Sequence, residues 1–301
     1  MKTIEVSASG SYQVKIGSGL LSTLGVQVAG ICRSGTAAIV SDSNVWPLYG
    51  KIATESLEKA GFRVVSFVFS AGEESKNGQT YLELLNFLAS RQVTRSDCLI
   101  ALGGGVVGDL TGFAAATYLR GIAYIQVPTT LLAAVDSSVG GKTAIDLPAG
   151  KNLAGAFYQP RLVLCDTDTL TTLPEEIFRD GCAEVIKYGV LYDPQLFSQL
   201  MLSGPDFDRE SVIARCVELK RDVVADDEFD TGARQKLNLG HTIGHGIEAH
   251  SHFTVSHGSA VAAGMAIVAR ASAARGICDA ETAGKIISTL IKFHLPTDTS
   301  L

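Results

Sequence analysis

The stretch Cys98-Leu-Ile-Ala-Leu-Gly-Gly-Gly-Val-Val-Gly-Asp109 runs from a short apolar segment into a glycine-rich turn, and the apolar residues 110–119 follow it. This order predicts a buried strand, a turn and a helix. Such a turn presents backbone N–H groups and the positive end of a helix to a phosphate. Gly103, Gly105 and Gly108 match Gly-x-Gly-x-x-Gly, although tight turns also require glycine for structural reasons alone.

This match departs from the standard dinucleotide-binding fingerprint in two ways. It follows the third predicted parallel strand instead of the first, and the next predicted strand, 122–127, does not end in an acidic residue. The strand–turn–helix context still favours a nucleotide pyrophosphate as the ligand.

Strand and helix patterns alternate on both sides of this turn. Residues 2–16 alternate apolar and polar around Gly10, which indicates an opening hairpin. Further strands are predicted at 37–42, 63–69 and 162–166, and helices at 45–60 and 78–91. The alternation predicts an α/β fold with a parallel, Rossmann-like sheet.

The pattern changes at Pro174, where apolar residues begin to recur every three or four positions. Helices are predicted at 175–191, 206–226, 237–249, 258–275 and 280–293, without intervening strands. We therefore predict an N-terminal α/β domain over residues 1–173 and an all-helical domain over residues 174–301.

Composition narrows the class of protein. The 301 residues suffice for one large or two medium domains, and 46% apolar with 19% charged residues is a globular composition. The net charge of −6 argues against general nucleic-acid binding, so an anionic substrate must meet a local basic cluster.

The six cysteines form no Cys-x-x-Cys pair and are predicted to be small buried residues in a reducing compartment. The sequence shows no signal core and no apolar run of about eighteen residues, so we expect a cytoplasmic protein without a membrane partner.

The segments 135–143 and 150–152 combine glycines, lysines and an aspartate without periodicity. We interpret them as a loop over a ligand, the alternative being a solvated surface segment. Gly140-Gly-Lys-Thr143 resembles part of a P-loop, but the spacing fails because residue 136 is Asp.

His241 and His245 stand four residues apart, which places both imidazoles on one face of a helix, and His257 follows. Imidazoles in such a cluster can bind a divalent metal; the alternative is polar residues at helix ends. The spacing matches His-Glu-x-x-His, but Thr242 occupies the position of the catalytic glutamate. A metal here is therefore expected to serve a reaction other than peptide hydrolysis.

Several motifs resemble the 3-dehydroquinate synthase family of sugar-phosphate cyclases, and the resemblance covers essentially the whole chain. They are Gly103-Gly-Gly-Val-Val-Gly-Asp-Leu-Thr-Gly-Phe113, Gln126-Val-Pro-Thr-Thr-Leu-Leu132, Val135-Asp-Ser-Ser-Val-Gly-Gly-Lys-Thr143, Gly150-Lys-Asn152, Ala183-Glu-Val-Ile-Lys-Tyr-Gly189 and Asn238-Leu-Gly-His-Thr-Ile-Gly-His245. The resemblance implies a Rossmann-like NAD-binding domain followed by a helical metal- and substrate-binding domain, and a cytoplasmic homodimer.

The resemblance also implies a phosphorus–oxygen lyase of the shikimate pathway, which leads to the aromatic amino acids. The expected reaction converts 3-deoxy-D-arabino-heptulosonate 7-phosphate into 3-dehydroquinate and phosphate. It proceeds by transient oxidation with NAD, phosphate elimination, re-reduction and intramolecular aldol closure.

The resemblance further implies a set of site residues. Zn²⁺, or Co²⁺ in its place, is expected on Glu184, His241 and His257. NAD is expected to contact Asp42, Gly72, Glu73, Lys76, Gly104, Gly105, Val106, Val107, Gly108, Asp109, Thr129, Thr130, Lys142, Lys151, Thr169, Leu170, Thr171 and Thr172. The phosphorylated keto sugar acid is expected to contact Arg120, Asp136, Lys142, Asn152, Lys187, Lys220, Arg234, Asn238 and His245. These cations supply the local basic cluster, and for His245 we predict contact with the phosphate or a proton-relay water instead of the metal.

Three departures from the family pattern leave alternatives open. Ser259 and Asp230 each stand where the family usually carries Glu, and the chain stops at Leu301 where family members continue, so we expect a short helical domain. The alternatives are another sugar-phosphate cyclase, a metal-dependent alcohol dehydrogenase with net NADH production, and a truncated paralogue that binds NAD, metal or partners without turnover.

Overall fold

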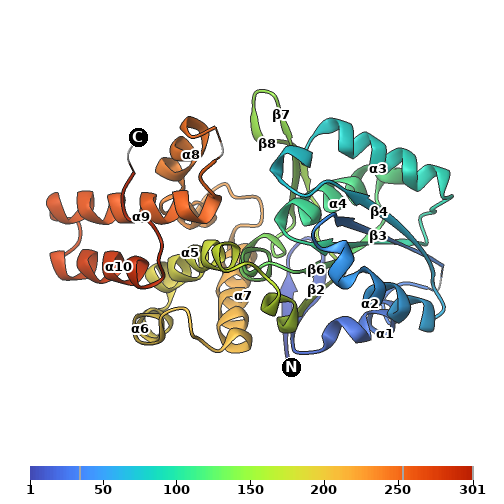
Figure 1. Cartoon of the computed structure of the whole chain (residues 1–301), viewed down its shortest axis with the longest axis horizontal. Coiled ribbons are helices and arrows are strands. Elements are labelled where there is room, and N and C mark those ends of the chain that lie inside the picture. Colours follow the sequence, from blue (N-terminus) through green and yellow to red (C-terminus); the bar gives the residue numbers. More distant parts are fainter. Residues whose placement is uncertain (34, 253, 300–301) are drawn as a thin grey trace. The chain divides into compact units, whose positions relative to one another are not determined.

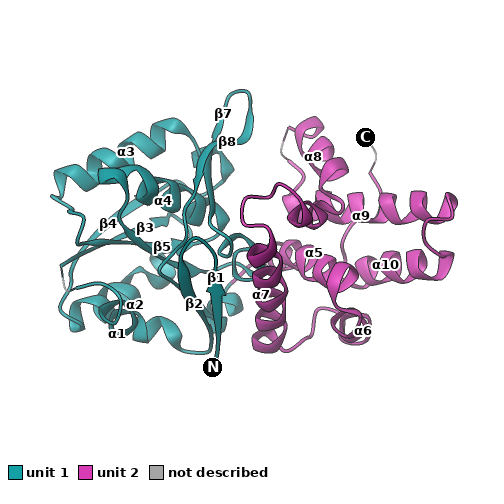
Figure 2. Cartoon of the chain, turned by 180° about the vertical axis from the view of Figure 1, so that it is seen from behind, with its two compact units in different colours: residues 1–172 teal, residues 173–301 magenta. Residues whose placement is uncertain are grey.

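The structure is a computed structural model that describes residues 1–33, 35–252 and 254–299. It divides into two compact units, Met1–Thr172 and Leu173–Leu301 (Figure 2). Among the described helices, none combines the length and the apolar character that crossing a membrane requires.

Unit 1 is built on a seven-stranded sheet with the order β1-β2-β9-β6-β5-β3-β4. Its strands are β1 (Lys2–Ser7), β2 (Ser11–Gly17), β3 (Thr36–Asp42), β4 (Arg63–Phe69), β5 (Cys98–Gly103), β6 (Ala123–Pro128) and β9 (Leu162–Asp166). β1 and β2 form the predicted antiparallel hairpin, with Ser7 opposite Ser11. All other neighbouring strands in this sheet are parallel, which confirms the predicted α/β class.

Helices cover both faces of this sheet. The helical segments of unit 1 are η1 (Leu20–Thr23), α1 (Leu24–Ala29), α2 (Trp46–Lys59), η2 (Glu73–Ser75), α3 (Gly78–Ser90), α4 (Gly105–Thr117), η3 (Tyr118–Arg120), the π-helical turn η4 (Ala133–Ser137) and η5 (Thr167–Thr171). α1 and α2 lie on one side of the strands, and α3 and α4 lie on the other (Figure 1). Alternate residues of β3 enter the two cores, Ile39 the first and Val40 the second. Burial on both faces explains why β3 and β5 appear in the sequence as continuous apolar runs.

The helix after the glycine-rich stretch was predicted to begin at residue 110, and this was wrong. α4 begins at Gly105, so most of the glycine motif forms the first turns of the helix and not a preceding turn. Glycine disfavours helix in isolation, but a Cβ at Gly108 would lie only 2.7 Å from Oε1 of Gln126 on β6. Glycine at position 108 therefore allows the helix to pack closely on the sheet without displacing Gln126, where propensity alone suggests a loop.

The segment predicted as an irregular loop over a ligand is instead largely regular. Two antiparallel strands, β7 (Lys142–Leu147) and β8 (Gly150–Phe157), form a hairpin of their own. Asp146 N donates to Lys76 O at 2.7 Å, which attaches this hairpin to the turn after β4. The period-two pattern was obscured because Gly150 and Gly155 replace side chains in β8 and the register shifts between Ile145 and Leu147.

The described residues of unit 2 form helices and connecting turns. The helical segments are α5 (Glu175–Tyr192), α6 (Pro194–Ser203), α7 (Arg209–Asp226), η6 (Ala233–Asn238), α8 (His241–His250), α9 (His257–Ala274) and α10 (Ala280–Lys292). α9 packs against α5, α8 and α10. The helical class is confirmed, although α6 was missed; its start is marked by Asp193, whose carboxylate accepts the N–H groups of Gln195 and Leu196.

Five of the six cysteines, all except Cys278, are buried, as predicted from their spacing.

Candidate functional site

The segments that the resemblance assigns to NAD follow the carboxyl ends of the parallel strands. Asp42 ends β3, residues 72–76 follow β4, residues 104–109 follow β5, Thr129 and Thr130 follow β6, and residues 169–172 follow β9. Parallel strands place these ends along one edge of the sheet. The chain moves from β3 outward to β4 and then returns to the other side of β3 with β5, so the strand order reverses between β3 and β5. Open α/β sheets bind nucleotides at such a reversal.

A buried ammonium group connects two of these segments with the hairpin β7–β8. Nζ of Lys76 lies 2.6 Å from Oδ2 of Asp109 on α4 and donates to Oδ1 of Asn152 on β8 at 2.6 Å. Lys76 is only 4% exposed. Burial lowers the pKa of Lys76, but the carboxylates of Asp109 and Glu73 outweigh it and raise the pKa overall. The turn after β4, the helix α4 and the hairpin are thus joined by a permanently charged lysine.

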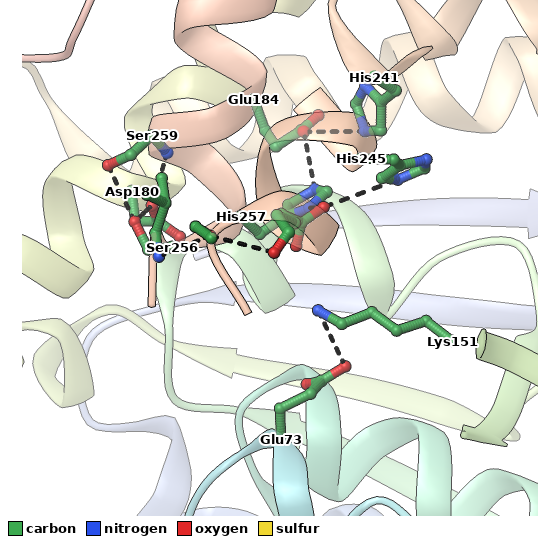
Figure 3. A network of polar contacts seen from close by, with 12 residues as sticks. Glu73, Lys151, Asp180, Glu184, His241, His245, Ser256, His257 and Ser259 are labelled. Carbon is green, nitrogen blue, oxygen red and sulfur yellow. Dashed lines mark hydrogen bonds and ion pairs between the residues drawn. The ribbon is translucent and has the colours of Figure 1, made fainter. Parts of the chain in front are cut away.

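The remaining predicted residues of unit 1 are distributed around the same elements. Nζ of Lys151 lies 3.6 Å from Oε1 of Glu73 (Figure 3). The Asp42 carboxylate accepts the backbone N–H groups of residues 44 and 45 and so organises the start of α2. Arg120 at the end of η3 and Lys142 at the start of β7 are exposed, and Asp136 is half-buried in η4. Sequence reasoning missed Tyr49, whose hydroxyl donates to Thr169 O at 3.0 Å and so supports the segment after β9.

In unit 2, the three predicted metal ligands lie together although they come from three helices. Nε2 of His241 lies 3.4 Å from Oε1 of Glu184, and Nε2 of His257 lies 3.6 Å from the same oxygen. The three ligand atoms all lie within 4.8 Å of one another. Figure 3 shows both imidazoles turned toward Glu184. Two imidazoles and one buried carboxylate at this spacing form a donor set that fits a divalent transition metal.

Local sequence explains how the three helices come so close. Gly240 adopts a φ of 81°, which ends η6 and lets α8 begin at His241. A Cβ at Gly258 would lie 2.0 Å from the carbonyl oxygen of Asp180, so the first turn of α9 contacts the backbone of α5 directly. His257 and Glu184 approach each other because this contact leaves no room for a side chain.

The two imidazoles have opposite electrostatic environments. Burial lowers the pKa of His241 to about 4, against the raising effect of Glu184. Burial also lowers the pKa of His257, but the carboxylates of Glu184 and Glu248 outweigh it and raise the pKa to about 10. His241 is therefore held neutral, the form that binds metal, whereas a cation must displace a proton from His257.

Glu248 is the residue of this cluster that sequence reasoning missed. It is 3% exposed, and its Oε2 lies 3.5 Å from Nδ1 of His257 and 4.0 Å from Nε2 of His245. A signal was present, because Glu248 stands seven residues after His241 and three after His245, on the same face of α8. His245 itself is exposed, and its ring centroid lies 5.5 Å from that of His241.

The predicted substrate cations of unit 2 are buried. Lys187 is 1% exposed and forms an ion pair with Glu184, one turn earlier on α5. Lys220 on α7 and Arg234 on η6 are also buried, and Nη1 of Arg234 donates to Glu228 O at 2.6 Å. Asn238 is exposed at the end of η6. Lys187 and Lys220 are therefore not ordinary surface lysines, and buried cations require anionic or polar partners.

Ser259, which stands where the family usually carries Glu, contacts a carboxylate of α5 through its backbone. Oδ1 of Asp180 accepts hydrogen bonds from Ser259 N at 2.8 Å and from Ser256 Oγ (Figure 3). Asp180 lies one turn before Glu184 on α5, and it therefore anchors the start of α9 to the helix that carries the acidic ligand. A second departure, Asp230, has a left-handed backbone with a φ of 58°.

Comparison with solved structures shows the class of the fold. The structure of 2-deoxy-scyllo-inosose synthase, complexed with carbaglucose-6-phosphate, NAD⁺ and Co²⁺, matches with a TM-score of 0.90 and 28% identity, covering 100% of this chain and 83% of that chain. The 2-epi-5-epi-valiolone synthase of Streptomyces hygroscopicus, with NAD⁺ and Zn²⁺ bound, matches with a TM-score of 0.88 and 26% identity, covering 99% of this chain and 84% of that chain. The fold is that of the sugar-phosphate cyclases.

The family follows from the sequence comparisons. The models of the 3-dehydroquinate synthase N-terminal and C-terminal regions match residues 66–180 and 181–301. The 3-dehydroquinate synthase of Pelobacter propionicus is 49% identical over 293 residues, which cover 95% of this chain and 82% of that protein. The chain belongs to the 3-dehydroquinate synthase family.

Proposed function

We propose that the chain catalyses the reaction of its family, the conversion of 3-deoxy-D-arabino-heptulosonate 7-phosphate into 3-dehydroquinate and phosphate, with NAD and a divalent metal. The observation that carries this proposal is the cluster of Glu184, His241 and His257, the first two of them buried, in a chain with this family membership. When bound, NAD would accept and return a hydride, and the metal would polarise substrate oxygens.

Glu184, His241 and His257 would hold the metal, Zn²⁺ or Co²⁺. Three protein ligands are typical of catalytic zinc sites, which keep further positions open for substrate. Full burial of the Glu184 carboxylate supports this role, because a buried anion is stable only beside cations or donors. Lys187 supplies one positive charge next to it, and a divalent ion would supply the rest.

NAD would be held along the carboxyl edge of the sheet in unit 1. The first turn of α4 offers backbone N–H groups and the positive helix end to the pyrophosphate. The segments after β4, β6 and β9, together with Lys142 and Lys151 of the hairpin, would complete the site. Lys76 would act mainly by fixing these segments, since its ammonium group already contacts Asp109 and Asn152.

The substrate carboxylate and phosphate would be bound by cationic side chains that have little exposure to solvent. Lys187, Lys220 and Arg234 are each less than 9% exposed, so their charges are poorly screened. Arg120, Asp136, Lys142, Asn152 and Asn238 would add further polar contacts to the substrate. His245, the exposed imidazole beside Glu248, would contact the phosphate or a proton-relay water instead of the metal.

The assembly and compartment belong to the same proposal. As the family resemblance implies, the chain would work as a homodimer in the cytoplasm. Light scattering on the purified protein tests the dimer, and fractionation of the source cells tests the compartment.

The experiment incubates the metal-loaded protein with NAD and the heptulosonate phosphate. We expect phosphate release and 3-dehydroquinate in equal amounts without net NADH. Net NADH formation with simple alcohols would indicate an alcohol dehydrogenase. Turnover only with sedoheptulose 7-phosphate or a hexose phosphate would indicate a different cyclase. Binding of NAD without phosphate release would indicate a non-catalytic paralogue.

A further inference from the structure

Glu248 is a buried acid that the roles proposed above do not use. Its side chain is 3% exposed on α8, and Oε2 faces Nδ1 of His257 across to α9 at 3.5 Å. A buried carboxylate is costly unless it meets donors. The geometry therefore gives Glu248 a specific partner on another helix.

The two imidazoles of the candidate metal cluster share one orientation. Each directs Nε2 toward Oε1 of Glu184 and Nδ1 toward another oxygen. For His241 this oxygen is Leu239 O at 3.3 Å, and for His257 it is the Glu248 carboxylate. Carbonyl and carboxylate oxygens only accept, so each Nδ1 contact can hold a proton on Nδ1, and a cation bound on Glu184 would take the place of any proton on Nε2.

We propose that Glu248 is a positioning residue that holds the His257 ring with Nδ1 protonated and Nε2 available to a cation on Glu184. The proposal rests on the metal-binding role proposed for the cluster. Metal-ligating histidines generally donate their second ring N–H to a carboxylate or carbonyl, which fixes the tautomer and the ring orientation. His241 receives this support from the backbone, so mutagenesis can remove it only at His257.

A competing arrangement uses the same atoms. His245, Glu248 and His257 also offer ligand atoms within 4.8 Å of one another, and His257 would then bind a cation through Nδ1. Burial favours the proposed arrangement, because Glu184 is fully buried and His241 is 9% exposed, whereas the His245 side chain is 61% exposed. The number of bound ions and the ring nitrogen that binds them separate the two arrangements.

The test measures Zn²⁺ affinity by competition with a chromogenic chelator for the wild type, Glu248→Gln and Glu248→Ala. We expect Glu248→Ala to weaken Zn²⁺ binding about 10- to 100-fold and Glu248→Gln to weaken it less, since the amide oxygen can still accept from Nδ1. Glu281→Gln is the matched control, because Glu281 is an exposed acid of unit 2 on α10. The Zn²⁺ affinity of this variant should equal that of the wild type.

A second readout keeps the proposal testable if Glu248→Ala unfolds. Metal analysis of the zinc-loaded wild type should show one ion per chain, and nitrogen-15 NMR should show Nδ1 of His257 protonated and Nε2 bound to metal. Metal on Nδ1, two ions per chain, or unchanged affinity in folded Glu248→Ala would each overturn the proposal. If the Zn²⁺ affinities change as expected but the wild type releases no phosphate, the role of Glu248 is supported and the proposed activity is overturned. A wild type that binds no Zn²⁺ would overturn both.

Discussion

Nζ of Lys76 lies 2.6 Å from Oδ2 of Asp109, and this ion pair joins the turn after β4 to the second turn of α4. Both residues belong to segments that we propose to hold NAD. The same ammonium group also donates to Asn152 on the hairpin. A single side chain therefore sets the relative positions of three elements at the carboxyl edge of the sheet.

Lys76→Met should destabilise unit 1 and weaken NAD binding. Removing the Lys76 ammonium group leaves the Asp109 carboxylate poorly solvated. Breaking a buried ion pair in this way typically lowers the free energy of unfolding by roughly 3 kcal/mol. Urea denaturation and a fluorescence titration with NAD measure the two effects. The control is Lys51→Met, which removes an exposed pair with Glu55 on α2 and should cost less than about 1 kcal/mol. Equal losses in the two variants would contradict a structural role for the buried pair.

Single histidine substitutions should separate metal ligands from the neighbouring imidazole. His241→Ala and His257→Ala should each lose the metal, because two protein ligands rarely retain a catalytic zinc ion. His245→Ala should keep about one ion per chain and lose activity. Metal analysis by mass spectrometry after dialysis measures the content, and loss of the ion from His245→Ala would show that the roles are reversed.

The cap of α6 should make stability depend on pH in a defined direction. Burial raises the pKa of Asp193, but the N–H groups of Leu196 and Gln195 and the Arg215 guanidinium outweigh it and hold the pKa below its ordinary value. Its folded-state pKa thus lies below the unfolded value of about 3.9, so the stabilisation is present above about pH 4 and is lost as pH falls through the folded pKa. Asp193→Ala should lower the free energy of unfolding by about 1 kcal/mol at pH 7.

Urea denaturation of the wild type and Asp193→Ala at several pH values provides the measurement. The difference between the two proteins should shrink toward zero as the wild-type carboxyl becomes protonated. A difference that stays constant down to pH 2 would mean that Asp193 acts through packing and not through its charge.

Gly258→Ala should loosen the contact between α5 and α9. The added Cβ would lie 2.0 Å from Asp180 O, and overpacking of this kind costs about 1–3 kcal/mol. Zn²⁺ affinity should fall as well, because His257 and Glu184 lie on the two helices that must separate. Gly284→Ala on α10 is the control, since its Cβ would meet nothing within 4 Å and should stabilise the helix by about 0.5–1 kcal/mol. A Gly258→Ala protein as stable as the wild type would contradict the close approach.

Much of the fold was readable from local pattern. β4 and β9 have the predicted bounds, because each appears in the sequence as a short, largely apolar run between turn residues; β9 is buried throughout, whereas β4 lies at the edge of the sheet and is partly exposed. Errors occurred where glycine serves tertiary packing. The start of α4 and the hairpin β7–β8 contain glycines that local propensity assigns to loops, whereas the contact between Gly108 and Gln126 arises only when the helix meets the sheet.

The chemical types of the candidate ligands were determined by the sequence alone: two imidazoles, one carboxylate and nearby lysines, in motifs that identify the family. Only the tertiary structure decided which atoms face one another. Glu184, His241 and His257 begin or lie on separate helices, and the orientation of each ring depends on oxygens contributed by other segments, Leu239 for one and Glu248 for the other. Spacing along the chain predicts which side chains share one face of a helix. The distance between two helices, in contrast, depends on the size of the residues at their contact, as Gly258 shows for α5 and α9.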